Sequence, residues 1–246
     1  MKISLITVVY NGEAFLQECF NSVRAQSHPE IEYLVIDGGS TDQTLKIIQE
    51  NSEHIDYFVS EKDAGLYDAI NKGIRQATGE IIGILNADDM LASADILATV
   101  AKTFISDPTI NGLYGDLNYI HPTKHQIFRK WKSKAATLND LKNGWMPAHP
   151  TLYLKRKLFE QYDGYSLDFG TAADYELILR YMYIHKIKTT YLPLLMVNMR
   201  TGGLSNQSLN SRLAALINDY KALKRNQVPY PLFALVRKKL SKLKQF

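Results

Sequence analysis

The sequence predicts an α/β fold in which a mostly parallel sheet is flanked by helices and is followed by a mixed C-terminal portion. Apolar, β-branched runs alternate four times with helical spacing of apolar residues over the first 105 residues. Such alternation is typical of parallel strands joined by right-handed crossover helices. Past Pro108 the alternation fails, so the second portion is expected to differ. The chain has 246 residues, 46% of them hydrophobic, which suffices for one large domain with an appendage.

Four strands are predicted in the first portion, each a short apolar run that ends at turn-forming residues. The strands are expected at residues 2–9, 31–36, 55–59 and 81–85. The helices that follow them are expected at residues 13–26, up to about 50, 67–77 and 94–104. No G-x-G-x-x-G motif follows the first strand, which argues against a dinucleotide-binding Rossmann domain.

The second portion is predicted to hold a β-pair, a short strand with a helix, a longer helix and a last strand. These elements are expected at 113–120 with 126–131, at 151–154 with 155–162, at 172–185 and at 189–197. No internal repeat or low-complexity linker interrupts the chain. We therefore expect one compact domain over residues 1–220, with its two halves meeting near residue 107, and a basic tail over 221–246.

The net charge of +4 is unevenly distributed along the chain. From Lys221 onward there are eight Lys or Arg and no Asp or Glu, and subtracting these eight from the total leaves −4 for the first 220 residues. A mildly acidic body argues against a nucleic-acid partner, which would require positive charge over a working face. The single cysteine, Cys19, fits a reducing compartment. With no apolar run of about 20 residues and a first strand beginning at Lys2, a cytoplasmic location is expected.

Two adjacent carboxylates stand directly after the fourth predicted strand. The run Ile81-Ile82-Gly83-Ile84-Leu85 stops at Asn86-Ala87-Asp88-Asp89. Ligands of open α/β folds bind at the carboxyl ends of parallel strands, so these side chains are placed for binding. Oxygen ligands suit Mg²⁺ or Mn²⁺, and such an ion would hold a phosphate-bearing substrate.

Five segments in order resemble family 2 glycosyltransferases, which are inverting enzymes of the GT-A fold that include many builders of bacterial exopolysaccharide and O-antigen. The resemblance covers about residues 2–205. The segments are Thr7-Val8-Val9-Tyr10-Asn11, Asp37-Gly38-Gly39-Ser40-Thr41-Asp42, the stretch from Glu61 to Gly73, Asn86-Ala87-Asp88-Asp89 and Ala173-Asp174-Tyr175. The resemblance implies a nucleotide-binding sheet in the donor half (1–107) and an acceptor half (108–220).

The family's D-x-D motif, which holds a divalent cation on the donor diphosphate, is matched by Asn86-Ala87-Asp88. The resemblance therefore implies Mg²⁺ or Mn²⁺ bound by Asp88, with Asp89 as a second ligand or an acceptor-side contact. Asn86 is neutral where an Asp is commonest, and is expected to bond the ribose or a metal-bound water. A turn with solvated carboxylates is the alternative for this segment.

Five further residues are implied in donor binding by the resemblance. Asp37 is expected to bond the uracil or ribose, with backbone contacts from Thr7 and Val9. Asp63 is expected to read the base, and Lys72 to neutralise a phosphate. The alternatives are a turn or capping role for Asp37 and an ordinary solvated position for Lys72.

The acceptor half supplies the expected catalytic base. By resemblance, Asp174 at the start of a late helix takes the proton of the acceptor hydroxyl, although Ala173 stands where the family commonly has Glu. His149 is placed to line the acceptor pocket or to approach the diphosphate and its metal, with a structural hydrogen-bonding role as the alternative. The polar loop 201–205 is a candidate to close over the diphosphate, or an ordinary connection.

The basic tail shows helical spacing of apolar residues. Leu232, Val236, Leu240 and Leu243 recur at three or four residues among lysines and an arginine. Two interpretations stay open: contact with an anionic membrane leaflet, or docking of the apolar stripe on the body or on a second subunit. The first would place the protein on the inner face of the cytoplasmic membrane.

The sequence as a whole predicts an inverting, metal-dependent glycosyltransferase. It would move one sugar from a nucleoside-diphosphate sugar, a UDP-sugar by default, to a hydroxyl of a bacterial glycan, preferably a lipid-linked one. A sugar nucleotidyltransferase would need a Gly-rich, Arg-containing loop after the first strand, which is missing. The neutral Asn86 and Ala173 leave open a non-catalytic nucleotide-sugar-binding or scaffold protein of a polysaccharide assembly complex.

Overall fold

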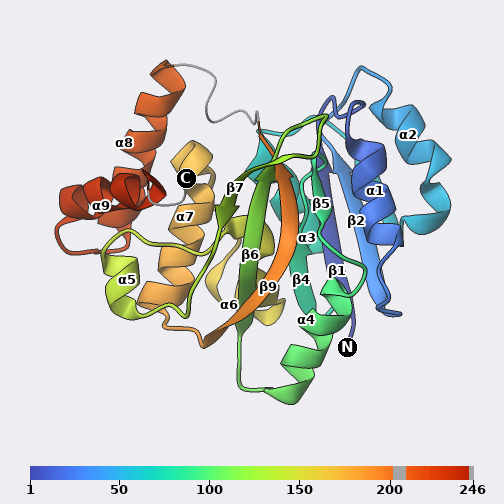
Figure 1. Ribbon diagram of the computed structural model, residues 1–246. Helices are drawn as coiled ribbons and strands as arrows, with labels where there is room; N and C mark the ends of the chain where they lie inside the picture. The colour runs from blue at the N-terminus through green and yellow to red at the C-terminus, as the bar shows by residue number, and fades with distance from the viewer. Residues whose placement is uncertain (202–208, 244–246) are drawn as a thin grey trace.

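The computed structural model describes residues 1–201 and 209–243, and within them it contains one nine-stranded mixed sheet. The strand order is β3-β2-β1-β4-β8-β6-β9-β5, and β7 pairs with β6 outside this path (Figure 1). Apart from Thr201, the loop predicted to close over the diphosphate lies outside the described residues.

The first four strands form the parallel part of the sheet, as predicted. Strand β1 pairs with β2 on one side and β4 on the other, and β2 also pairs with β3, all in parallel register. The strands are β1 (Ile3–Val9), β2 (Ile31–Asp37), β3 (Tyr57–Ser60) and β4 (Ile81–Ile84). Every residue of β1 and β4 is buried, which explains why most of their residues are apolar.

Helices cover both faces of this sheet, and each face has its own hydrophobic core. One core includes side chains of α1 (Leu16–Arg24), α2 (Thr44–Glu50) and α4 (Ile96–Ser106). The other includes side chains of α3 (Leu66–Gln76). Helix α3 lies close to the sheet because Gly73 has no side chain: a Cβ there would stand 2.5 Å from an Ile6 methyl carbon.

The second portion adds mixed pairing, as expected, and its last strand also pairs with an unpredicted strand of the first portion. Strand β6 is antiparallel to β7 and β8 but parallel to β9. Their bounds are β6 (Gly112–Ile120), β7 (Ile127–Trp131), β8 (Tyr153–Lys155) and β9 (Thr189–Arg200). The unpredicted strand β5 (Asp89–Leu91) pairs antiparallel with β9. Its three residues are too few to show any alternation in the sequence.

The predicted helix at 172–185 is present but changes type in its middle. It begins as α7 (Ala173–Ile178) and continues as a π-helix (Leu179–Ile184), in which the amide of His185 bonds to the carbonyl of Arg180, five residues back. The remaining short helices of this portion are α5 (Leu138–Lys142) and α6 (Lys157–Tyr162). Single 3-10 segments lie at Ser52–His54, His149–Thr151 and Leu167–Ala172.

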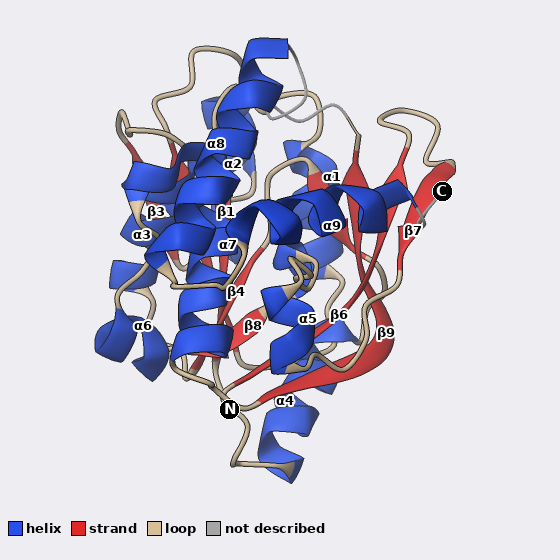
Figure 2. Ribbon diagram, turned by 90° about the vertical axis from the view of Figure 1, so that its left-hand side faces the viewer, coloured by secondary structure: helices blue, strands red, loops and turns tan. Residues whose placement is uncertain are grey.

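Two further helices end the described chain, α8 (Leu209–Arg225) and α9 (Pro231–Leu243). Helix α8 was not predicted, and it runs through residue 220, where the boundary between domain and tail was expected. Both helices contribute to the core that contains α3 and α7, and Figure 2 shows them in front of the sheet on the side of α7. Among the described helices, none is both long and apolar enough to span a bilayer.

Candidate active site

The predicted donor residues gather where β1, β2 and β4 end. Asp37 is the last residue of β2 and lies opposite Val9, the last residue of β1. The segment 86–89 follows β4, and Leu85 continues its pairing by bonding to the carbonyl of Ile6. The carboxyl ends of three neighbouring parallel strands therefore meet at one edge, which is the usual ligand position in open α/β sheets.

Asp88 and Asp89 occupy different environments although they are adjacent. Asp89 is fully buried in β5, where its two oxygens accept from the Asn86 amide at 3.1 Å and the Arg200 backbone N–H at 3.3 Å. Burial and the charge of Asp88 raise the pKa of Asp89 well above its usual range. Asp88 is only partly buried, and burial raises its pKa while Arg200 lowers it. The structure thus leaves Asp88 as the accessible carboxylate of the pair.

Arg200, at the end of β9, is a site residue that the sequence reasoning missed. Its side chain is almost fully buried and bonds to the Asp88 carbonyl at 2.8 Å, the Glu18 carboxylate at 2.7 Å and the Pro122 carbonyl at 3.0 Å. The guanidinium also lies 4.5 Å from the ring centre of Phe15. It ties three separate segments together and places a positive charge beside the two carboxylates. The only sequence signal was an arginine ending an apolar strand.

The chemistry of this donor set fits a divalent cation that is shared with a phosphate. Mg²⁺ commonly takes only one or two protein carboxylates and completes its shell with phosphate oxygens and water. Asp88 is accessible, and the raised pKa shows that its charge is poorly compensated by the protein. Among residues 1–201 and 209–243, no group of three or more His, Cys, Asp or Glu side chains is arranged to hold an ion. Asp88 would therefore hold the cation together with the donor diphosphate.

Asp37 is placed at the expected edge, but its oxygens are already engaged. It is fully buried and accepts from the backbone N–H groups of Gly39 at 3.1 Å and Ser40 at 3.0 Å. The hydroxyls of Ser40 and Ser60 donate to it at 2.5 and 2.6 Å. This geometry corresponds to the turn-forming alternative, and a contact with the uracil or ribose stays a prediction. The decisive partner Ser60 lies 23 residues away and gave no local signal.

Thr7 and Val9 lie inside the sheet rather than on an open rim. The Thr7 hydroxyl accepts from the Tyr33 hydroxyl at 2.9 Å and is fully buried. The Val9 carbonyl accepts from the Gly38 N–H at 2.9 Å. Their backbone contacts with a donor therefore remain predictions.

Asp63 lies directly over the loop that follows β2. A Cβ at Gly38 would stand 2.5 Å from Asp63 Oδ2, so this carboxylate can approach only because residue 38 is glycine. Its other oxygen accepts from the Gly65 N–H at 2.8 Å. The ring of Tyr10, 65% exposed, lies against the same loop and offers a flat surface for a base. Tyr10 belongs to the first of the resembling segments, but the sequence predicted no role for it.

Lys72 faces the loop before α3. Its ammonium lies 2.9 Å from the Glu61 carboxylate and 4.0 Å from that of Asp68, and it donates to the Lys62 carbonyl at 3.1 Å. The side chain is 15% exposed. These contacts of Lys72 stabilise the loop that carries Asp63. A contact of Lys72 with a phosphate stays a prediction.

Asp174 begins α7 and meets a group of aromatic side chains. Its charge and hydrogen bonding act on the hydroxyl of Tyr67, whose pKa is raised well above its usual range by burial and by Asp174. Tyr67 stacks on Tyr165 with ring centres 5.3 Å apart, and the Tyr165 hydroxyl lies 2.7 Å from His149 Nε2. Burial lowers the pKa of His149, against the opposing effect of Asp174. His149 thus lies beside the predicted base, with one ring nitrogen engaged by tyrosine.

The segment from Glu61 to Gly73, which precedes β4, joins the two halves of the site. Asn71 of α3 donates to the Tyr165 carbonyl at 2.7 Å and accepts from its N–H at 2.9 Å. A Cβ at Gly164 would lie 2.4 Å from the Asn71 side-chain oxygen, so the approach needs glycine. Tyr67, four residues before Asn71, reaches Asp174 from the same helix. Helix α3 therefore positions acceptor-half residues as well as bordering the donor half.

The carboxylates of the two halves come together at Tyr119 of β6. Burial raises the pKa of Tyr119, Arg129 lowers it, and both Asp89 and Asp174 raise it. One of these carboxylates belongs to the donor half and the other to the acceptor half. Their shared effect on a single phenol agrees with a site between the two halves.

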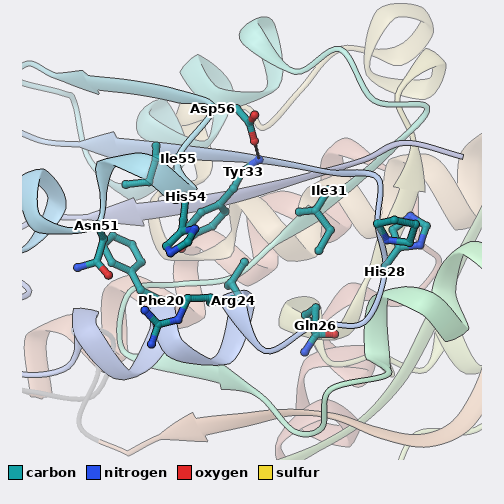
Figure 3. A pocket seen from close by; sticks show the side chains of 12 residues that line it. Phe20, Arg24, Gln26, His28, Ile31, Tyr33, Asn51, His54, Ile55 and Asp56 are labelled. Carbon is teal, nitrogen blue, oxygen red and sulfur yellow. Dashed lines mark hydrogen bonds between the residues drawn. The ribbon is translucent and has the colours of Figure 1, made fainter.

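A cavity outside the candidate site lies on the α1 side of the sheet. It has a volume of about 240 Å³ and is bounded by side chains of α1, of the amino-terminal end of β2 and of residues 51–56 (Figure 3). None of the predicted site residues lines it. The candidate site lies instead at the edge of the sheet where β1, β2 and β4 end.

Comparison with known proteins agrees with this geometry. The family described as glycosyl transferase family 2 matches residues 4–163. A PGL/p-HBAD biosynthesis glycosyltransferase of Mycobacterium bovis (strain BCG / Pasteur 1173P2) is 32% identical over 207 residues, covering 82% of this chain and 78% of its relative. An uncharacterized glycosyltransferase of Mycobacterium tuberculosis is 31% identical over 186 residues, covering 72% of this chain and 68% of the relative.

Solved structures confirm the GT-A fold. S. aureus TarS aligns with a TM-score of 0.69 at 20% identity over 93% of this chain, although the chain spans only 39% of TarS. The mannosyltransferase PcManGT from Pyrobaculum calidifontis, solved with GDP-Man and Mn²⁺, aligns with a TM-score of 0.68 at 19% identity. That alignment covers 97% of this chain and 68% of PcManGT.

Proposed function

Because the chain belongs to glycosyl transferase family 2, we propose that it moves one sugar from a nucleoside-diphosphate sugar to a hydroxyl group of a glycan acceptor. The default donor is a UDP-sugar, with Mg²⁺ or Mn²⁺ as cofactor. TarS has been solved with UDP and PcManGT with GDP-Man and Mn²⁺, which supports a nucleotide-sugar and a divalent ion here. The carrying observation is that β1, β2 and β4 end at one edge of the sheet, where Asp37 and the segment 86–89 lie.

Asp174 is the proposed general base of an inverting transfer. The acceptor oxygen attacks the anomeric carbon from the face opposite the diphosphate, and its proton passes to the Asp174 carboxylate. The bond between the anomeric carbon and the diphosphate oxygen breaks, and the electron pair leaves with the nucleoside diphosphate. Asp174 suits this step because its place at the start of a buried helix restrains the carboxylate.

The donor half is proposed to bind the nucleotide and the diphosphate. Asp63 and the exposed Tyr10 ring recognise the base, while the loop shaped by Asp37 brings backbone groups to the ribose. Asp88 would hold the divalent cation, which when bound offsets negative charge on the leaving diphosphate. Arg200 keeps the Asp88 backbone in place through its 2.8 Å bond to the carbonyl. Asp89, buried and bonded at both oxygens, completes the strand end rather than the ion's coordination shell.

The acceptor is proposed to be a lipid-linked glycan at the inner face of the cytoplasmic membrane. The support for this location is the chain from Lys221 onward, which carries eight basic residues and no acidic one. An anionic lipid surface attracts such a segment, and a lipid-linked acceptor would be presented at that surface.

A donor panel tests the proposal. The full chain is mixed with UDP-, GDP- and dTDP-sugars in Mn²⁺, Mg²⁺ or EDTA, and thermal stability and release of nucleoside diphosphate are measured. One donor should stabilise the protein in a metal-dependent way, since ligand at about 100 times its Kd adds roughly 2.7 kcal/mol, and should be slowly hydrolysed. Binding without release under any condition would favour the non-catalytic alternative, and absence of both would contradict the proposal.

A further inference from the structure

Helix α9 turns its apolar side away from the protein. Its inward positions include Ala234, which is fully buried, and Lys238, which is 6% exposed, while Leu235 is partly buried against the core. Four large apolar side chains of the same helix face outward, namely Leu232, Phe233, Val236 and Leu240, which are between 53% and 67% exposed. An amphipathic helix on a globular body normally buries its apolar side. Docking of the stripe on the body does not fit the exposure of Leu232, Val236 and Leu240, whereas membrane contact and docking on a second subunit stay open.

The body holds α9 firmly in this orientation. The Lys238 ammonium lies 2.8 Å from the Asp219 carboxylate of α8 and 3.3 Å from the ring centre of Tyr175 in α7. On the facing loop, a Cβ at Gly144 would stand 2.4 Å from the Ala234 carbonyl oxygen, so the contact is as close as glycine allows. These contacts fix the rotation of α9 about its own axis, so its apolar side faces outward as a consequence of the fold.

Basic side chains border this apolar surface on both sides. At 100° per residue, Lys239 falls on one flank of the exposed stripe and Arg237 on the other. Both are exposed, and Arg237 bonds to the Asn143 side chain at 2.8 Å, which holds it at the edge. No acidic residue occurs after Asp219 to offset them. An apolar centre with basic flanks is complementary to a bilayer whose headgroups are anionic and whose interior is apolar.

We propose that α9 is a membrane-docking helix, with the exposed stripe inserted at the headgroup boundary of an anionic lipid surface. The choice of a lipid-linked acceptor rests on the proposed function, but the docking itself does not. Figure 1 draws α9 on the side of α7, with α1 and α2 on the far side of the sheet. Tyr175, the ring under Lys238, directly follows the proposed base. Docking through α9 would therefore present the acceptor half to the membrane and leave the donor half toward the solution.

Vesicle binding of the full chain tests the proposal. Vesicles of phosphatidylcholine with about one-third phosphatidylglycerol are compared with pure phosphatidylcholine by co-sedimentation, at low and high salt. We expect binding to the anionic vesicles only, weakened by salt. The double variant Val236→Ser/Leu240→Ser should lower the partition coefficient by at least about tenfold. The variant Arg237→Gln/Lys239→Gln should lower it several-fold and reduce the salt dependence.

The matched control is Ile105→Ser on α4, because Ile105 is 59% exposed like the α9 side chains but belongs to another surface. It should bind vesicles as the unchanged protein does. Donor hydrolysis in solution should be equal for all four proteins, so its loss would count against the proposed function and not against docking. Equal binding to neutral vesicles, no binding at all, or a stable dimer in sedimentation velocity that Val236→Ser/Leu240→Ser dissociates would each overturn the membrane proposal.

Discussion

Glu32, at the amino-terminal end of the parallel strands, and the pair Asp88 and Asp89, at their carboxyl-terminal edge, lie in opposite electrostatic environments. At the amino-terminal end, Glu32 is bonded by the side chains of Lys2, Ser4 and Thr78. Burial acts to raise the pKa of Glu32, but these hydrogen bonds outweigh it and lower the pKa to about 2. At the carboxyl-terminal edge, burial raises the pKa of Asp88 and, further, that of Asp89.

This difference separates stability from function. A carboxylate that the protein satisfies completely stabilises the fold and has nothing left to offer a ligand. A carboxylate whose charge is poorly compensated destabilises the empty protein slightly and gains most when a cation binds. Asp37 lies at the functional edge but belongs with Glu32 by its contacts, because four donors already engage it.

Asp174→Asn should produce the largest effect on activity. Removing a general base typically costs about 10²–10⁴-fold in rate, so transfer to the acceptor should nearly stop while donor affinity stays within about twofold. Initial rates with the donor found in the panel, together with calorimetric donor binding, measure the two quantities. The matched variant Asp168→Asn, on the preceding 3-10 segment, should transfer normally. Normal transfer by Asp174→Asn would remove it from the role of base.

Asp88→Ala should come next and should act on binding. Removing a residue that only orients a metal ligand typically lowers metal affinity by about 10- to 100-fold. Removing the ligand itself should cost at least as much. The donor Kd should therefore rise by about tenfold or more in Mn²⁺ and should no longer respond to EDTA. Asp89→Asn should leave the metal dependence in place if Asp88 is the accessible ligand. An Asp89→Asn protein that loses metal response while Asp88→Ala keeps it would reverse the assignment.

The outline of both edges could be predicted from the sequence, whereas the differences between neighbouring residues could not. Apolar runs and their turns located β1 to β4 and placed Asp88 at a strand end, since those signals are local. The environment of Asp89 depends on β5, a three-residue strand that pairs with residues about 110 positions away. Arg200 reaches Glu18 across 182 residues. No local pattern reports such pairings, so the buried member of the Asp88–Asp89 pair needed the structure.

The orientation of α9 could not be predicted for the same reason, since it depends on contacts with other helices. Helical spacing located α9, and the apolar stripe with its basic neighbours was visible in the sequence. The direction in which the stripe faces is decided by Lys238, whose partner Asp219 lies on α8. In the sequence, Lys238 cannot be distinguished from a solvated lysine, because the residues that it contacts belong to two other helices.

Glu32→Gln should affect stability while leaving activity intact. The substitution replaces a charged hydrogen-bond acceptor with a neutral amide. The free energy of unfolding should therefore fall by about 1–3 kcal/mol at pH 7. Because the folded-state pKa is lowered, the stabilisation is complete above the unfolded pKa of about 4.5 and is lost as the pH falls toward 2. Urea unfolding at several pH values should show the two proteins converging in acid. Glu30→Gln, on an exposed pair with the N-terminal amine, should change little, and a pH-independent loss would contradict the charge argument.

The smallest expected effect tests whether the functional edge extends onto α3. In Tyr67→Phe the ring still stacks on Tyr165, but the hydroxyl near Asp174 is lost. One hydrogen bond of about 0.5–1.5 kcal/mol corresponds to a drop in kcat of about two- to tenfold. Donor affinity and the free energy of unfolding should stay close to those of the unchanged protein. A fall in kcat at unchanged donor affinity and unchanged stability would place the hydroxyl in the acceptor site, whereas a parallel loss of stability would contradict that role.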